Sequence, residues 1–126
     1  MKILLVDDSK IMRNIQQRVL TALGETQFSE ANDGAEAMNL TRSNQYDLIL
    51  ADWNMPNMDG ITFLRNFRTT DKKTPLIMVT TEVEKSRVLD AIKAGANNYV
   101  VKPFTPETLM DKVKQTLAKS AAPAAA

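Results

Sequence analysis

The sequence contains no cysteine and no histidine, and each absence excludes a kind of chemistry. Without cysteine there is neither a disulfide framework nor a thiolate nucleophile, which fits a reducing compartment. Without histidine there is no Ser-His or Cys-His nucleophile pair, no imidazole zinc site and no histidine phosphodonor within the chain. Any phosphoryl group that this protein handles must therefore come from another molecule.

Long apolar runs and an excess of charge of one sign are also missing. No apolar run approaches the roughly 20 residues that span a bilayer, and Met1-Lys2 leads directly into a short apolar run without the features of a signal peptide. The formal net charge is only +1, which provides no electrostatic footprint for nucleic acid. We therefore expect a cytoplasmic protein that binds neither membranes nor nucleic acid.

What the sequence does contain is the alternation typical of an α/β domain. Its 126 residues, of which 44% are hydrophobic and 25% charged, are enough for one globular domain with a sizeable core. Strand and helix signals alternate five times along the chain, which predicts a doubly wound sheet. We expect the domain to occupy residues 1–119 and the Ala/Pro-rich tail, residues 120–126, to be disordered.

Capping and helix-ending residues delimit the predicted helices. Gly24 and Gly95 follow apolar stripes and predict the ends of the first and fourth helices. Asp33, three residues before Glu36, and Thr105 are N-cap candidates for the second and last helices. In the first helix, apolar residues recur every four positions and predict its one apolar face: Ile11, Ile15, Val19 and Leu23.

Four short apolar runs each end on a polar residue. Such runs are typical of strands buried on both faces of a parallel sheet. In an open α/β sheet the ligand crevice lies outside the carboxyl ends of the strands, so these polar residues are expected to meet in one site. Three carboxylates, one hydroxyl and one ammonium suit a divalent cation beside a phosphoryl group. The runs and their polar residues are ILLV before Asp7 and Asp8, LILA before Asp52, LIMV before Thr80, and YVV before Lys102.

Taken singly, each of these polar residues has an ordinary structural alternative. An acid after a strand often caps a helix or turn, Thr80 could simply be a β-former, and Lys102 before Pro103 could be a solvated surface lysine. The acids together are harder to explain, because placing Asp52 about 5 Å from the acid pair costs roughly 3 kcal/mol per like-charge pair at an effective dielectric constant of about 20. The combination therefore predicts a cation site. We also expect the peptide bond before Pro103 to be cis.

Three stretches of this sequence together closely resemble the receiver domain of two-component response regulators: Val6-Asp7-Asp8, Asp52 through Gly60, and Tyr99 through Thr105. The resemblance runs from about Lys2 to Leu117 and is greatest to the chemotaxis members of the family. It implies a flavodoxin-like fold, a five-stranded parallel sheet in the order 2-1-3-4-5 flanked by five helices. It also implies a single-domain signalling switch rather than an enzyme, one that assists its own phosphorylation and dephosphorylation.

The resemblance assigns the phosphoryl chemistry to the strand ends. Asp52 would be the phosphoacceptor for a separate histidine kinase. Lys102 and the hydroxyl of Thr80 would hold the phosphoryl oxygens. Thr80 and Tyr99 would form the pair that switches conformation after phosphorylation.

A Mg²⁺ site and a partner surface are implied in the same way. The metal would be held by Asp7, Asp8, Asp52 and the backbone carbonyl of Asn54, with Asp7 acting mostly through water. A surface formed by the fourth helix, fifth strand and fifth helix would dock on the flagellar motor switch, although its two valines could equally be packing residues. A monomer is expected, and a phosphatase is a further partner that the resemblance allows. The residues of this partner face are Lys85, Val88, Tyr99, Val101 and Lys112.

Two other interpretations remain open at this point. An aspartyl-nucleophile phosphatase of the haloacid dehalogenase type would need a second aspartate two residues after the nucleophile, where this chain has Asn54, and a cap domain that 126 residues cannot supply. The chain could also be the receiver part of a longer regulator whose output domain follows the Ala/Pro-rich tail.

Overall fold

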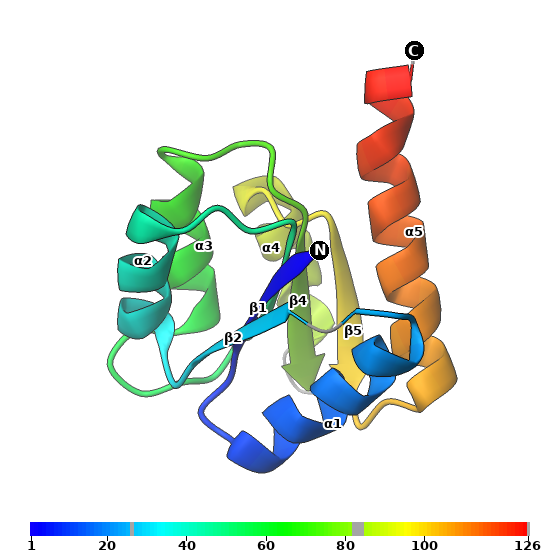
Figure 1. Cartoon of the computed structure of the whole chain (residues 1–126). Helices are drawn as coiled ribbons and strands as arrows, with labels where there is room; N and C mark the ends of the chain where they lie inside the picture. Colours follow the sequence, from blue (N-terminus) through cyan, green and yellow to red (C-terminus); the bar gives the residue numbers. More distant parts are fainter. Residues whose placement is uncertain (26, 82–84, 126) are drawn as a thin grey trace.

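The computed structural model describes residues 1–25, 27–81 and 85–125, and the centre of the fold is a parallel sheet (Figure 1). All neighbouring strands run parallel, in the order β2-β1-β3-β4-β5. This confirms the fold class and the strand order that the resemblance implied. The strands are β1 (Lys2–Val6), β2 (Gln27–Ala31), β3 (Leu48–Asp52), β4 (Leu76–Thr81) and β5 (Asn98–Lys102).

Helices cover both faces of the sheet (Figure 1). Because side chains alternate along a strand, Leu4 of β1 packs with α2, α3 and α4, whereas Ile3 and Leu5 pack with α1 and α5. The inner strands β1, β3 and β4 therefore read as continuous apolar runs, since both of their faces are buried. The helices are α1 (Lys10–Ala22), α2 (Gly34–Ser43), α3 (Gly60–Arg68), α4 (Val88–Ala94) and α5 (Pro106–Ala125), with a short 3₁₀ turn, η1, at Lys85–Arg87.

The predicted helix termini are confirmed. The carboxylate of Asp33 accepts a hydrogen bond from the backbone N–H of Glu36 at 2.8 Å, and the hydroxyl of Thr105 accepts one from the N–H of Thr108 at 3.1 Å. Gly95 caps α4 in the left-handed conformation with φ of 115°. These caps satisfy backbone groups that the helix ends leave without partners.

The apolar face predicted for α1 packs on the core only in its second half, at Val19 and Leu23. Ile11 is 74% exposed and Ile15 is 38% exposed, whereas Arg13 and Gln16 are buried. The first half of α1 lies beside the polar ends of the strands, so polar side chains face inward there. Only from Val19 onward does the helix pack an apolar residue on the sheet.

The backbone of α5 continues as a helix through the Ala/Pro-rich segment to Ala125. Alanine has the highest intrinsic helix propensity, which favours this continuation. The division into a domain over residues 1–119 and a separate disordered tail stays a prediction. No helix in the described parts of the chain is long and apolar enough to cross a membrane.

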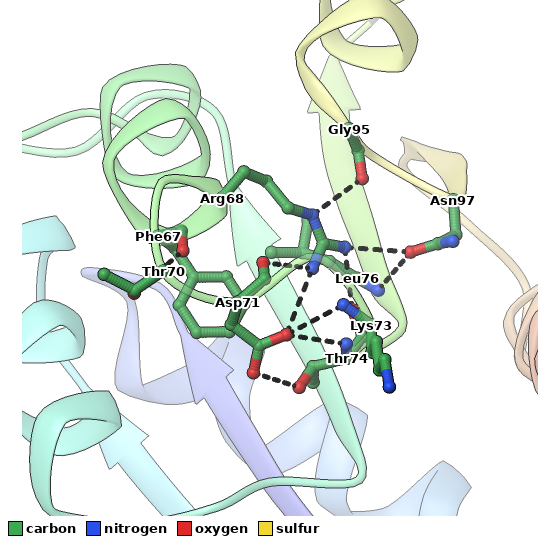
Figure 2. A network of polar contacts seen from close by, with 9 residues as sticks. All are labelled: Phe67, Arg68, Thr70, Asp71, Lys73, Thr74, Leu76, Gly95 and Asn97. Atoms are coloured by element: carbon green, nitrogen blue, oxygen red, sulfur yellow. Dashed lines mark hydrogen bonds and ion pairs between the residues drawn. The ribbon is translucent and has the colours of Figure 1, made fainter.

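A half-buried arginine joins the amino-terminal ends of β4 and β5, opposite the predicted site (Figure 2). Arg68, near the end of α3, donates to the backbone carbonyls of Gly95 at 3.0 Å and Thr74 at 2.7 Å, and to the side-chain oxygen of Asn97 at 3.1 Å. That oxygen also accepts a hydrogen bond from the N–H of Leu76 at 2.9 Å. This network fixes the end of α4 to α3 and to the sheet.

Candidate functional site

Three carboxylates converge at the carboxyl edge of the sheet. Asp7 directly follows β1, and Asp52 is the last residue of β3, the strand paired with β1. Asp8 comes next in the chain after Asp7. One oxygen from each carboxylate lies within 4.8 Å of the others. The structure thus brings together the acidic cluster that the sequence predicted.

Lys102, at the end of β5, reaches across β4 to this cluster. Its Nζ lies 3.0 Å from Oδ1 of Asp52 and 3.2 Å from Oδ2 of Asp7. Burial by itself lowers the pKa of Lys102, but the contacts with Asp52 and Asp7 raise the pKa above its ordinary value. The lysine is therefore charged at neutral pH. The Lys102-Pro103 bond is cis, as expected.

The cluster carries more negative charge than Lys102 neutralises. Burial, followed by the charge of Asp7, raises the pKa of Asp52 from 3.8 to about 6 despite the nearby lysine. Burial likewise raises the pKa of Asp7. Ionised carboxylates held in this way are stabilised by an added cation. Clustered carboxylate oxygens are the ligands that Mg²⁺ takes in proteins, so the residues present fit this ion.

The hydroxyl of Thr80 lies at the same edge and has no hydrogen-bond partner within the described residues. Thr80 belongs to β4, one residue beyond Val79, which pairs with Asp52. Its side chain is completely buried and its Oγ1 is unsatisfied. An unsatisfied buried hydroxyl costs about 1–3 kcal/mol, so this atom is available to a ligand at the site.

Two predicted site residues are less tightly placed. Asn54 is exposed in the loop that follows β3, and the role of its carbonyl as a metal ligand stays a prediction. Tyr99 of β5 is half-buried, and the ammonium of Lys112 from α5 lies 4.6 Å from the centre of its ring. The switch role of Tyr99 also stays a prediction.

The remaining partner-face residues come from adjacent elements. Val88 begins α4 and Val101 lies in β5, and both are half-buried. The backbone of Lys85 begins η1, but its side chain lies outside the described residues. Val88, Val101 and Lys112 fall on the helices and the strand that the resemblance named, and Lys85 lies in the 3₁₀ turn directly before α4. Docking of a partner on this face stays a prediction.

Sequence reasoning missed Arg13, which supports the acidic strand end. Its guanidinium donates to the backbone carbonyl of Asp7, to the carboxylate of Glu30 at 2.8 Å and to the side-chain oxygen of Asn32 at 3.1 Å. The arginine thereby joins α1 to the carboxyl ends of β1 and β2. In the sequence Arg13 lies outside the apolar stripe predicted for α1, so periodicity does not single it out.

A doubly wound sheet in this strand order, with an acid pair, a third aspartate and a lysine at its carboxyl edge, is the arrangement of a response regulator receiver. The family model of the response regulator receiver domain matches residues 3–114. The chain belongs to this family.

Similarity to individual proteins extends over nearly the whole chain. The Campylobacter jejuni chemotaxis protein CheY homolog is 46% identical over 120 residues, which cover 93% of this chain and 92% of the relative. Chemotaxis protein CheY of Pseudomonas aeruginosa is 44% identical over 117 residues, covering 91% of this chain and 94% of the relative. The solved structure of the Vibrio cholerae chemotaxis response regulator CheY4 superposes with a TM-score of 0.84 at 36% identity, covering 92% and 98% of the two chains.

Proposed function

We propose that this protein is a signalling switch that a separate histidine kinase phosphorylates on Asp52 in a Mg²⁺-dependent reaction. The observation that carries the proposal is the position of Asp52. Its buried carboxylate lies among two further carboxylates, 3.0 Å from the ammonium of Lys102. A carboxylate can attack phosphorus without a general base, which agrees with the absence of histidine from the chain.

Different residues of the site have different roles in phosphoryl transfer. An oxygen of Asp52 forms the bond to phosphorus as the bond to the donor nitrogen of the kinase histidine breaks. Lys102 places its charge where the phosphoryl oxygens of the product lie, and the free hydroxyl of Thr80 supplies a hydrogen bond. Asp7, Asp8, Asp52 and the carbonyl of Asn54 would hold Mg²⁺, which would supply the further positive charge that this reaction needs.

A role in chemotaxis is supported by the curated relatives. The Campylobacter jejuni and Pseudomonas aeruginosa proteins are named as chemotaxis proteins and match almost end to end. The output is therefore proposed to be binding to a flagellar motor switch protein through the face that contains Val88, Tyr99, Val101 and Lys112. The protein acts as a cytoplasmic monomer, with a phosphatase as a further partner.

Labelling with acetyl phosphate tests the acceptor. In the presence of Mg²⁺, the protein is expected to gain one phosphoryl group that is stable in acid and labile in alkali, because it is an acyl phosphate. Peptide mapping by mass spectrometry should place the group on Asp52, and Asp52→Asn should remove it. Asp47→Asn, at an exposed aspartate before the same strand, is the matched control and should keep it. A label on any other residue contradicts the assignment.

The switch is tested at Thr80. Phosphorylation is expected to draw the Thr80 hydroxyl toward the phosphoryl group and to let the ring of Tyr99 turn inward, which changes the partner face. Beryllofluoride is a mimic of the phosphoryl group. Affinity for a peptide from the motor switch protein should rise about tenfold when it is bound, a coupling free energy of about 1.4 kcal/mol between the two ligands. Fluorescence titration of the peptide measures this affinity.

Thr80→Ala should leave Mg²⁺ binding intact but abolish the response of the peptide to beryllofluoride, because a ligand shifts an equilibrium only through differential contacts with the two states. Thr81→Ala, at the neighbouring position of β4, is the control and should keep the response. An equal gain in affinity for the wild type and Thr80→Ala would show that Thr80 does not carry the coupling.

A further inference from the structure

The loop that joins Asp52 to α3 is closed tightly at its base. The N–H of Gly60, the first residue of α3, donates to the carbonyl of Trp53 at 2.8 Å. A Cβ atom at Gly60 would lie 2.1 Å from the carbonyl oxygen of Asp52, which no side chain can tolerate. The loop thus starts and ends at the phosphoacceptor strand, and Asn54 lies within it.

The far side of this loop is fastened to the start of α2. Nδ2 of Asn57 donates to Oδ2 of Asp33 at 2.8 Å, and the carbonyl of Met58 accepts from the N–H of Gly34 at 3.0 Å. A Cβ atom at Gly34 would lie 2.8 Å from Met58, so the two backbones are in close contact. These contacts join residues that are 24 positions apart in the sequence.

Both partners of the side-chain hydrogen bond are adapted to it. Asn57 has a φ of 65°, in the left-handed region that asparagine and glycine tolerate best. Asp33 is buried, and its other oxygen caps α2 by accepting from the N–H of Glu36 at 2.8 Å. The hydrogen bond from Asn57 and this capping bond lower the pKa of Asp33, which therefore stays ionised.

We propose that the bond between Asp33 and Asn57 is a latch that positions the loop for Mg²⁺ binding, so that both are positioning residues for the metal site. The inference rests on the proposed function, because it concerns the same ion. Asn54 lies between the closed base of the loop and the latch, so both ends of the segment that carries its carbonyl are fixed. Without this hydrogen bond the loop samples other conformations. Mg²⁺ binding must then also order the loop, which costs free energy.

Three variants separate the latch from other roles of these residues. Asn57→Gly keeps the left-handed backbone and removes the amide. Asp33→Ser keeps an N-cap hydroxyl for α2 but is too short to reach Asn57. Asp33→Asn removes the same charge as Asp33→Ser, but it can re-form the bond after the Asn57 amide turns over.

Mg²⁺ titration of the whole chain provides the test, with the fluorescence of Trp53 as the readout because this single tryptophan follows Asp52 directly. Asn57→Gly and Asp33→Ser should each weaken Mg²⁺ binding roughly three- to tenfold, the loss of one hydrogen bond. The double variant should be no weaker than the poorer single variant, because both changes remove one interaction. Asp33→Asn should bind within about twofold of the wild type.

The outcomes distinguish the latch from the proposed function. If wild-type protein shows no Mg²⁺ binding, the proposed function itself is wrong. If the wild type binds Mg²⁺ and the variants bind equally well while their melting temperatures fall, the bond only stabilises the fold and the latch is overturned. Additive losses in the double variant, or an equal loss in Asp33→Asn, also contradict the latch, because they point to separate or purely electrostatic effects.

Discussion

Asp52→Asn is expected to stabilise the metal-free protein by about 3 kcal/mol above pH 7. Burial and the charge of Asp7 raise the pKa of Asp52 from 3.8 to about 6, so ionising this carboxyl costs more in the folded than in the unfolded protein. Each pKa unit corresponds to about 1.4 kcal/mol, which gives the expected magnitude. Asparagine has nearly the same shape as the protonated acid and avoids this cost.

The effect has a defined pH dependence. Because the folded state binds the proton more tightly, wild-type stability falls as pH rises from about 4 to about 6, and the loss is complete above that range. The difference between Asp52→Asn and the wild type should therefore be near zero below about pH 4 and largest above about pH 7. Urea denaturation at several pH values, with a chelator present, measures it.

A surface aspartate and added Mg²⁺ provide the controls. Asp111→Asn, at an exposed position of α5, should change stability by less than about 0.5 kcal/mol at every pH. Saturating Mg²⁺ should raise the melting temperature of the wild type more than that of Asp52→Asn, because the variant lacks one carboxylate oxygen of the proposed Mg²⁺ site. If Asp52→Asn destabilises the metal-free protein at high pH, Lys102 already neutralises the cluster and an ion is not needed for that purpose.

The sheet and the meeting of the strand ends were predictable from short-range patterns. A run such as ILLV ending on Asp7 shows both burial on two faces and the place where the strand stops. Parallel strands bring their carboxyl ends to one edge, so the contact between Lys102 and Asp52 followed from topology despite a separation of 50 residues in the sequence. Capping of α2 by Asp33 followed from local chemistry in the same way.

Periodicity failed where a polar site competes with the core. It selected the face of α1 with Ile11 and Ile15, but the buried side chains in that half of the helix are Gln16 and Arg13, and the guanidinium of Arg13 donates to the carbonyl of Asp7. The carbonyl that Arg13 contacts belongs to another element of the fold, so the sequence of the helix alone does not show that this arginine is buried. The hydrogen bond between Asp33 and Asn57 was unpredictable for a related reason, because each residue also serves its own cap or turn and gives no sign of a distant partner.

Lys102→Met is expected to destabilise the metal-free protein by about 3–5 kcal/mol at about pH 8, since it leaves the buried carboxylates of Asp7 and Asp52 without their lysine. Methionine has a similar length and apolar stem, so packing is largely kept. Lys114→Met, at an exposed position of α5, is the matched control and should have little effect. Urea denaturation again measures the stability.

The loss of stability in Lys102→Met should depend on the charge of the Asp7 and Asp52 carboxylates. Lys102 lowers the pKa of both Asp7 and Asp52, so without it both pKa values rise further above the ordinary range. Protonation then relieves the repulsion, and most of the lost stability should return as pH falls toward 5. A variant that is equally unstable at both pH values has lost packing rather than a charge interaction.

A double-mutant cycle isolates the contact between Lys102 and Asp52. In an Asp52→Asn background, Lys102→Met should cost much less stability than in the wild type, because only the pair with Asp7 remains to be broken.

Mg²⁺ should restore more stability to Lys102→Met than to the wild type, since the ion replaces the missing positive charge. Phosphorylation by acetyl phosphate should nevertheless stay slow in Lys102→Met at saturating Mg²⁺, because the phosphoryl oxygens then lack the ammonium that stabilises them. A phosphorylation rate equal to that of the wild type would show that Lys102 stabilises the resting site but does not assist phosphoryl transfer.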